Sequence, residues 1–283
     1  MSAPQQNDTP RLRAERDAAV RAARHAARFV RSRVGAAGAR ERKTLNDFVT
    51  EADERAQEII TEVLADAFPA YDVLAEEGTD LDGISPVPGR PRWIVDPIDG
   101  TTNFMHAVPP YAVSIALQQE GGALAVGVVL EVSSGRLYTA TRGGGAYCDG
   151  APLAACPVRA MGEALVATGF PFRTFEHLER YGRVLRRVIR AAQGVRRQGA
   201  AAVDLARVAA GRFGAFFETG LRPWDVAAGA LLVREAGGRV TDYRGRAEIG
   251  GEGFLFGGQI AATGGPLQGE LLAFVEDVQD VRT

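Results

Sequence analysis

Apolar and polar positions along the chain follow two periodicities, one typical of helices and one of strands. Helical periodicity in the Ala/Arg-rich stretch 12–34, followed by Gly35 and Gly38, predicts a long first helix. The segment Thr50-Glu51-Ala52-Asp53 has the spacing of a capping box, so a second helix is expected to start there and to run to about Phe68. Two amphipathic helices are therefore expected near the start of the chain.

Strand-like apolar runs dominate the region that follows. The two longest are expected to form an antiparallel pair, because a Gly-Gly turn lies between them. The glycine-rich stretch 143–152 predicts a loop and a soft boundary between two halves. The expected strands are residues 71–75, 93–95, 111–119, 124–132 and 136–142.

The second half of the chain alternates between helix and strand patterns, which favours an α/β fold. Helices are expected at 175–192, 202–210, 225–235 and 267–278, and strands at 164–167, 213–217, 239–242, 254–258 and 259–262. The organisation predicted from these elements is a disordered tail (1–10), an N-terminal half (11–150) and a C-terminal α/β half (151–283), together forming one continuous domain.

Composition narrows the class of protein. The chain has 283 residues, of which 46% are hydrophobic and 24% charged, as expected for a soluble globular protein with a sizeable core. Its net charge of −2 and its lack of a long apolar run point to neither nucleic acid nor membrane as a partner. Cys148 and Cys156 lack metal-binding spacing, so two reduced thiols in a cytoplasmic protein are expected.

Arginines are concentrated in the first predicted helix, between Arg11 and Arg33. They alternate with alanines and with Glu15 and Asp17, a pattern typical of a solvated helix face. A targeting role, or binding of an anionic partner such as RNA, is the alternative interpretation.

The segment Trp93–Phe104 carries the clearest chemical signal. An apolar run ends at Asp96, and Pro97 is expected to stop further sheet pairing. Asp99 follows, and the next residues, Gly100, Thr101 and Thr102, suit the start of a helix with free backbone N–H groups. Two carboxylates beside such a helix start are what a phosphate site bridged by divalent cations requires.

Further acidic residues lie where other predicted elements begin or end: Glu76 and Glu77 after a strand, and Asp225 at a helix start. Each could be a surface carboxylate or a helix cap. Together with Asp96 and Asp99 they could share two or three Mg²⁺ ions, with the Ile98 carbonyl as a further ligand. We find no GxSxG, GxxxxGK[ST] or HExxH motif, and the three histidines are scattered, with only His106 close to the acidic motif.

Four ordered blocks stand out: Asp47–Asp53 (DFVTEAD), Glu76-Glu77, Asp96–Phe104 (DPIDGTTNF), and Trp224–Gly229 with Glu235–Gly238. With these blocks the chain resembles the inositol monophosphatase family over most of its length. Two further segments, Gly169–Phe172 and Phe217–Asp225, are similar to bacterial members. The chain departs from the family where Glu131-Val132 stands, because the family often has proline after this strand.

The resemblance implies an αβαβα sandwich, dependence on two to three Mg²⁺ ions, inhibition by lithium and a homodimer. It also assigns roles to residues. The metal ligands implied are Glu76, Asp96, Ile98 (through its carbonyl), Asp99 and Asp225. The catalytic residues implied are Thr101 and Asp53, which orient the attacking water, and Glu76. The substrate-binding residues implied are Asp99, Gly100, Thr101, Thr102, Ala201, Glu218 and Asp225.

The expected reaction is hydrolysis of a phosphate monoester by in-line attack of a metal-activated water. The expected substrate is a small phosphorylated polyol, with myo-inositol 1-phosphate first. Histidinol phosphate, fructose 1,6-bisphosphate and a nucleotide 3′-phosphate are alternatives within the same chemistry. A regulatory binding protein that uses the fold without catalysis is an alternative from another class.

Overall fold

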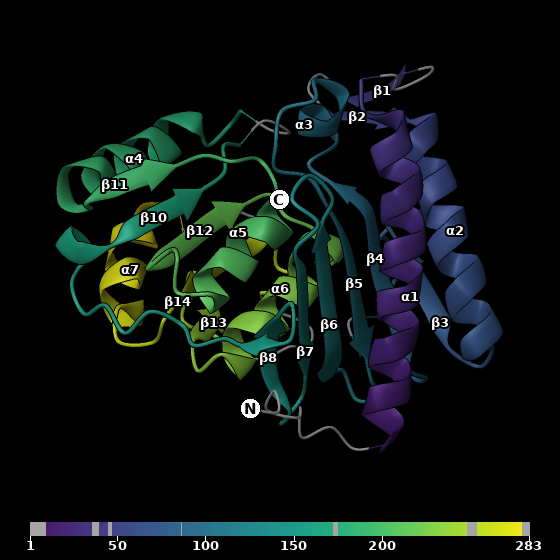
Figure 1. Ribbon diagram of the computed structural model, residues 1–283. Helices are drawn as coiled ribbons and strands as arrows, with labels where there is room; N and C mark the ends of the chain where they lie inside the picture. The colour runs from purple at the N-terminus through teal and green to yellow at the C-terminus, as the bar shows by residue number, and fades with distance from the viewer. Residues whose placement is uncertain are drawn as a thin grey trace.

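The computed structural model describes residues 10–35, 40–44, 47–85, 87–171, 175–247 and 254–278, with backbone alone for 10, 40–44 and 47–50. In this part of the chain, helices and sheets form five layers in the order helix, sheet, helix, sheet, helix (Figure 1). The expected αβαβα sandwich is therefore confirmed. Most of the expected tail, Gly38 and the side chain of Thr50 lie outside the described residues.

The first layer contains α1 (Pro10–Arg33) and α2 (Glu51–Ala67), close to the predicted helices. Both pack on the seven-stranded sheet, α1 against β5 and β6 and α2 against β4 (Figure 1). The packed face of α1 is mostly alanine, and this small side chain allows the helix to approach the sheet closely. Between the two helices, β1 (Arg40–Thr44) and β2 (Asp47–Thr50) form an antiparallel pair.

The second layer is a sheet of seven strands in sequential order: β3 (Asp72–Ala75), β4 (Arg92–Asp99), β5 (Ala112–Gln118), β6 (Leu124–Glu131), β7 (Leu137–Thr141), β8 (Gly145–Cys148) and β9 (Ala151–Pro152). Every residue of β4, β5 and β6 is buried, because helices cover both faces of the sheet. The expectation of a loop at 143–152 is wrong. Gly143, with positive φ, lies in the turn after β7, and β8, which begins at Gly145, and β9 extend the sheet.

The middle layer contains α5 (Ala201–Ala209) and α6 (Pro223–Glu235), which pack against each other and lie between the two sheets. The backbone of α6 lies very close to β6 at Gly127. A Cβ added at Gly127 would lie 2.7 Å from the carbonyl oxygen of Ala228. Only glycine at this position permits the observed distance between the sheet and the helix.

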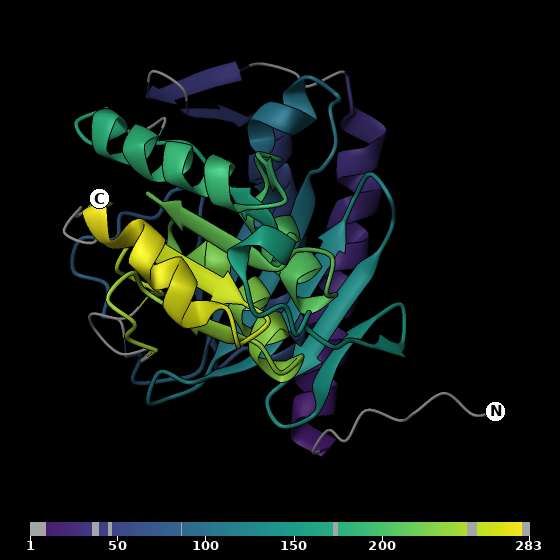
Figure 2. The ribbon, with the colours of Figure 1, turned by 90° about the vertical axis from the view of Figure 1, so that its left-hand side faces the viewer.

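The fourth layer is a five-stranded sheet in the order β11 (Gly194–Arg196), β10 (Leu165–Thr168), β12 (Ala215–Thr219), β14 (Gln259–Thr263) and β13 (Arg239–Thr241). The outer layer consists of α4 (Leu178–Ala191) and α7 (Gln268–Val275), which lie in front of this sheet in Figure 2. Two short 3₁₀ helices, η1 (Met161–Glu163) and η2 (Glu276–Val278), flank these elements.

Two predictions for the second half are wrong in detail. Residues 254–258 form turns and not a strand, although Phe254 and Leu255 are buried. A short apolar run shows that side chains are buried but not that the backbone pairs with a neighbour. The helix expected from residue 175 begins at Leu178, and β11 was not predicted.

Two expectations from composition can be compared with the structure. Cys148 and Cys156 form no disulfide, as expected. Among the described helices, none combines the length and the apolar character that crossing a bilayer requires.

The close approach of β6 and α6 makes a testable prediction. Gly127→Ala should lower the free energy of unfolding by about 2–3 kcal/mol, since the new methyl group forces backbone apart. Gly182→Ala in α4 is the matched control, because nothing lies within 4 Å of its added Cβ. It should be neutral or stabilise by about 0.5–1 kcal/mol. Urea unfolding compares the two variants, and an equal effect at both positions would contradict the packing argument.

Candidate active site

The site is built around the end of β4. This strand continues through Pro97, so the expectation that pairing stops there is wrong. Asp96 pairs with Ser114 and Asp99 with Ala112, and the register shifts between these two pairs. Proline is tolerated at such an irregularity because no ladder hydrogen bond is needed from it. The shift leaves Asp96 and Asp99 both buried, at 1% and 6% exposure.

Gly100 turns the chain from β4 into the short helix α3 (Thr101–Met105). Its φ of +89° is in the left-handed region, and an added Cβ would lie 3.0 Å from the carbonyl oxygen of Gly199 and 3.2 Å from that of Pro110. Both the backbone conformation and the packing therefore require glycine. The turn places the first residues of α3 directly beside Asp99.

Thr101 connects α3 to α2. Its hydroxyl lies 3.0 Å from Oδ1 of Asp53 and 3.1 Å from the carbonyl oxygen of Ile98. Asp53 is fully buried on α2. A hydroxyl has one hydrogen to donate, so its oxygen retains lone pairs for a further donor. The predicted pair Thr101 and Asp53 is thus in hydrogen-bonding contact.

Glu76 follows β3, and its backbone N–H donates to the carbonyl oxygen of Val95 at 3.1 Å. The backbone of the next residue, Glu77, forms two hydrogen bonds with α2. The side chain of Gln57 donates to the Glu77 carbonyl oxygen at 2.9 Å and accepts from the Glu77 N–H at 2.8 Å. Sequence reasoning did not identify Gln57, since a single glutamine on a helix gives no signal.

Two of the acidic side chains bind the first turns of the central helices. Oδ1 and Oδ2 of Asp99 accept from the backbone N–H groups of Ala201 and Ala202, at 3.0 and 2.9 Å. Asp225, which is 8% exposed, accepts from the N–H of Arg222 at 2.6 Å at the start of α6. The positive ends of α5 and α6 therefore both face the acidic side chains.

Electrostatic coupling shows that the four acids share one region. Burial raises the pKa of the Asp96 carboxyl well above its usual range, and the charges of Glu76, Asp99 and Asp225 raise it further. Burial also raises the pKa of Asp99, as do Asp225 and Asp204, while the N–H groups of α5 oppose the change. Like charges at this density disfavour the ionised forms, which a bound cation would stabilise.

The donor set fits a hard divalent cation, because it offers carboxylate oxygens and the Ile98 carbonyl. Among the described residues, no three His, Cys, Asp or Glu side chains are gathered closely enough to form a metal-binding group as they stand. Backbone N–H groups occupy one lone pair on each oxygen of Asp99 and on one oxygen of Asp225. Each carboxylate oxygen of Asp99 has a second lone pair with which it could bind a cation.

Glu218 lies at the end of β12, half-buried and close to the backbone of Gly169. A Cβ added at Gly169 would overlap the Glu218 carboxyl group at 1.8 Å, so this glycine makes room for it. Burial and then Asp204 raise the pKa of Glu218, whereas Arg197 opposes the change. Asp225 and Asp99 also act on it, which places Glu218 beside the acids described above.

The other predicted substrate-binding residues differ in how far they are buried. Ala201 is buried at the start of α5 and contacts Asp99, while Thr102 is exposed on α3. Asp204, buried on α5, was not predicted, although it acts on the pKa of both Asp99 and Glu218. Phe172 lies outside the described residues.

This arrangement of two sheets with helices between them is shared with known proteins. The sequence pattern described as the inositol monophosphatase family matches residues 12–280. Nus factor SuhB of Escherichia coli K12 is 40% identical over 261 residues, covering 92% of this chain and 94% of that protein. An inositol-1-monophosphatase of Rhizobium meliloti is 45% identical over 199 residues, covering 70% and 73%.

A solved structure of a similar protein has the same fold. The extragenic suppressor protein suhB of Bartonella henselae superposes with a TM-score of 0.84 at 36% identity, covering 93% of this chain and 98% of that one. The fold is that of a family of metal-dependent phosphatases. The chain belongs to the inositol monophosphatase family.

The buried carboxyl of Asp204 gives a pH-dependent prediction. Burial raises its pKa from 3.8 to about 7. Because the folded state holds this proton more tightly than the unfolded state, stability is greatest at low pH and falls as pH rises towards 7. At about 1.4 kcal/mol per pH unit, wild type should lose about 3 kcal/mol more than Asp204→Asn between pH 5 and 8. Urea unfolding measures this difference, and parallel pH profiles would contradict it.

Proposed function

We propose that the protein hydrolyses phosphate monoesters with Mg²⁺, and that its substrate is myo-inositol 1-phosphate or a similar phosphorylated polyol. The observation that carries the proposal is the burial of Asp96 and Asp99 at the end of β4, directly before α3, where Thr101 contacts the buried Asp53. Membership of the inositol monophosphatase family supports the reaction class. The name of the Rhizobium meliloti relative supports the substrate.

The residues that would hold two to three Mg²⁺ ions are Glu76, Asp96, Asp99 and Asp225, together with the Ile98 carbonyl. When bound, the metal supplies a Lewis acid for the phosphoryl oxygens and lowers the pKa of water. The helix starts add to this field, because α5 and α6 both direct backbone N–H groups towards the acids.

Thr101 and Asp53 position the attacking water in this proposal. The Thr101 hydroxyl donates to Asp53 or to the Ile98 carbonyl, so its oxygen is left to accept a hydrogen bond from water. Asp53 is buried and close enough to accept a proton through Thr101. The N–H groups of Gly100, Thr101 and Thr102 face the phosphoryl oxygens.

The alcohol part of the substrate lies between α5 and β12 in this proposal. Glu218 accepts hydrogen bonds from its hydroxyl groups, and the backbone at Ala201 contributes beside Asp99. The space that Gly169 leaves for the Glu218 carboxyl supports a binding role for this side chain. A polyol has several hydroxyl donors and suits such a carboxylate.

A substrate panel tests the choice of alcohol. Purified protein is assayed for phosphate release from myo-inositol 1-phosphate, histidinol phosphate, fructose 1,6-bisphosphate and a nucleotide 3′-phosphate, with and without Mg²⁺ and lithium. We expect Mg²⁺-dependent, lithium-inhibited release, fastest with the inositol ester. A preference for another ester would change the substrate, and no release above background would favour a regulatory binding protein. The homodimer and the cytoplasmic location stay predictions.

A substitution tests the acidic site itself. Asp99→Asn should lower kcat on myo-inositol 1-phosphate by on the order of a hundredfold, because it removes a charge that the metal requires. Asp277→Asn is the control, since this carboxylate is on the surface and lies 3.7 Å from Arg187 in the outer layer. Near-normal turnover by Asp99→Asn would remove Asp99 from the ligand set.

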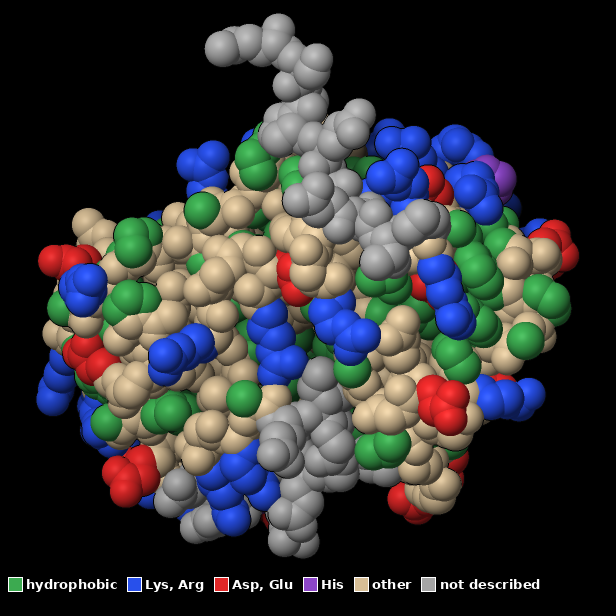
Figure 3. All heavy atoms as spheres, turned by 90° about the horizontal axis from the view of Figure 1, so that it is seen from below, with side chains coloured by type: hydrophobic (Ala, Val, Ile, Leu, Met, Phe, Trp, Pro, Cys, Tyr) green, Lys and Arg blue, Asp and Glu red, His purple; other side chains and the backbone are tan. Residues whose placement is uncertain are grey.

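A second function is favoured by the exposed face of α1. The face opposite the buried alanines carries a row of exposed arginines, and basic side chains gather where α1 lies, at the upper right of Figure 3. The row comprises Arg13, Arg21, Arg24 and Arg28. We propose that this row binds RNA. The relative in Escherichia coli is named as a Nus factor, which also points to a role in a transcription complex.

Salt-dependent RNA retention tests this second function. The triple variant Arg21→Ala, Arg24→Ala and Arg28→Ala should bind RNA more weakly than wild type. It should also lower the slope of log affinity against log salt by about 2, since about 0.7 is lost per single-strand phosphate contact. The matched control replaces Arg183, Arg186 and Arg190, which are exposed on α4. Equal loss in both triple variants, or in neither, would contradict a specific role for α1.

A further inference from the structure

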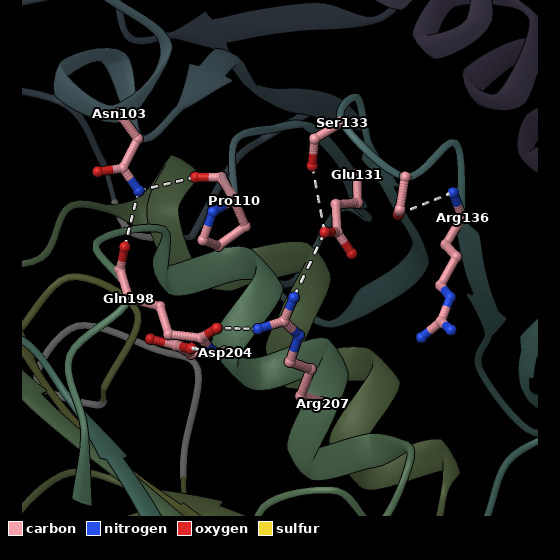
Figure 4. A network of polar contacts seen from close by, with 9 residues as sticks. Asn103, Pro110, Glu131, Ser133, Arg136, Gln198, Asp204 and Arg207 are labelled. Atoms are coloured by element: carbon pink, nitrogen blue, oxygen red, sulfur yellow. Dashed lines mark hydrogen bonds and ion pairs between the residues drawn. The ribbon is translucent and has the colours of Figure 1, made fainter. Parts of the chain in front are cut away.

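A continuous set of polar contacts joins α3, the segment before α5, α5 itself and the end of β6 (Figure 4). At one end, Nδ2 of Asn103 on α3 donates to the carbonyl oxygens of Gln198 and Pro110, at 2.7 and 2.8 Å. Gln198 lies in the segment that precedes α5. The side chain of Gln198 contacts α5, so the hydrogen bond from Asn103 to Gln198 connects α3 to α5.

The side-chain amide of Gln198 both donates and accepts a hydrogen bond. Nε2 donates to Oδ1 of Asp204 at 2.5 Å, and Oε1 accepts from Nη1 of Arg207. Asp204 and Arg207 are both on α5, less than one turn apart. The side chain of Gln198 therefore holds the segment before α5 against the helix itself, and Arg207 is one of its two partners there.

Arg207 reaches a second element with its other nitrogen. Nη2 lies 3.3 Å from Oε1 of Glu131, the last residue of β6, and the hydroxyl of Ser133 donates to the same oxygen at 3.3 Å. The Glu131 side chain is only 6% exposed and that of Arg207 is 23% exposed. A carboxylate this buried requires a charged or hydrogen-bonding partner, which Arg207 and Ser133 supply.

The turn after β6 begins at Val132, which is held by hydrogen bonds on both sides of its peptide group. Val132 has an N–H group, which donates to the carbonyl oxygen of Tyr111 at 2.9 Å. Its own carbonyl oxygen accepts from Arg31 at 2.7 Å. Hydrogen bonds therefore hold this turn in place, and the contact between Glu131 and Arg207 lies at its start.

The segment that Gln198 anchors contacts the site directly. The Gly199 carbonyl oxygen and the Ala200 side chain lie 3.0 and 3.3 Å from the position of a Cβ on Gly100. The next two N–H groups, of Ala201 and Ala202, bind the Asp99 carboxylate. A shift of this segment would therefore move both the neighbour of the phosphate motif and the donors to an acidic ligand.

We propose that Arg207 is a positioning residue of the active site. By binding Gln198 and Glu131 together, it fixes residues 198–200 against Gly100 and the first N–H groups of α5 against Asp99. Its effect on rate rests on the proposed phosphatase function, but its effect on the segment before α5 does not. A misplacement of about 1 Å in such a constellation is enough to slow a reaction substantially.

Two measurements on purified wild type, Arg207→Met and Arg207→Lys test this role. Hydrogen exchange reads the N–H groups of Ala201 and Ala202 directly, and steady-state kinetics with myo-inositol 1-phosphate and Mg²⁺ reads the rate. In Arg207→Met, exchange at these two groups should be about tenfold faster, and kcat about tenfold lower with KM within about twofold. Arg207→Lys, which keeps the charge, should recover part of both effects.

The matched control is Arg187→Met on α4, whose guanidinium donates to the Ala273 carbonyl oxygen at 3.1 Å, far from the acidic site. It should change neither measurement. Unchanged exchange at Ala201 and Ala202 in Arg207→Met would overturn the proposal, as would faster exchange throughout the molecule with a lowered Tm. Faster local exchange in a protein that releases no phosphate even as wild type would support the positioning role and reject the phosphatase.

Discussion

The repulsion between buried carboxylates is the constraint on which the rest of the structure depends. Asp96 and Asp99 lie three positions apart on one strand, and Glu76 and Asp225 belong to other elements. Such charges disfavour one another strongly away from water. Backbone N–H groups at two helix starts oppose this repulsion: those of Ala201 and Ala202 in α5 bind Asp99, and that of Arg222, just before α6, binds Asp225. Holding these helices between two sheets is therefore what allows the site to exist in a stable protein.

Long strands and chemically distinctive segments could be predicted from the sequence. Strands β5 and β6 were predicted because both faces are buried, which makes their apolar runs nearly continuous. The acids were found because each stands beside an element end. Strands β8 and β9 and the turns at 254–258 were missed, since neighbours far along the chain decide how short segments pair. Arg207 and Glu131 were missed for the same reason, because 76 residues separate them.

The acidic site and the arginine row of α1 occupy different parts of the fold. The site lies where β4, α3 and the central helices meet, whereas the row lies on the outer face of the first layer. The same fold occurs in relatives named as an inositol-1-monophosphatase and as a Nus factor. Fold alone does not decide between such roles. Because the two surfaces are separate, the proposed catalysis and the proposed RNA binding can be tested independently, and one does not exclude the other.

Anomalous diffraction from crystals of the protein soaked with Mn²⁺ in place of Mg²⁺ tests the central claim most directly. If the clustered carboxylates form a cation site, anomalous peaks will lie about 2.0–2.3 Å from oxygens of Asp96 and of at least one of Glu76, Asp99 and Asp225. Peaks confined to other surfaces, with these side chains in place and none between them, would contradict the account. The burial and the mutual repulsion of the acids would then need another explanation.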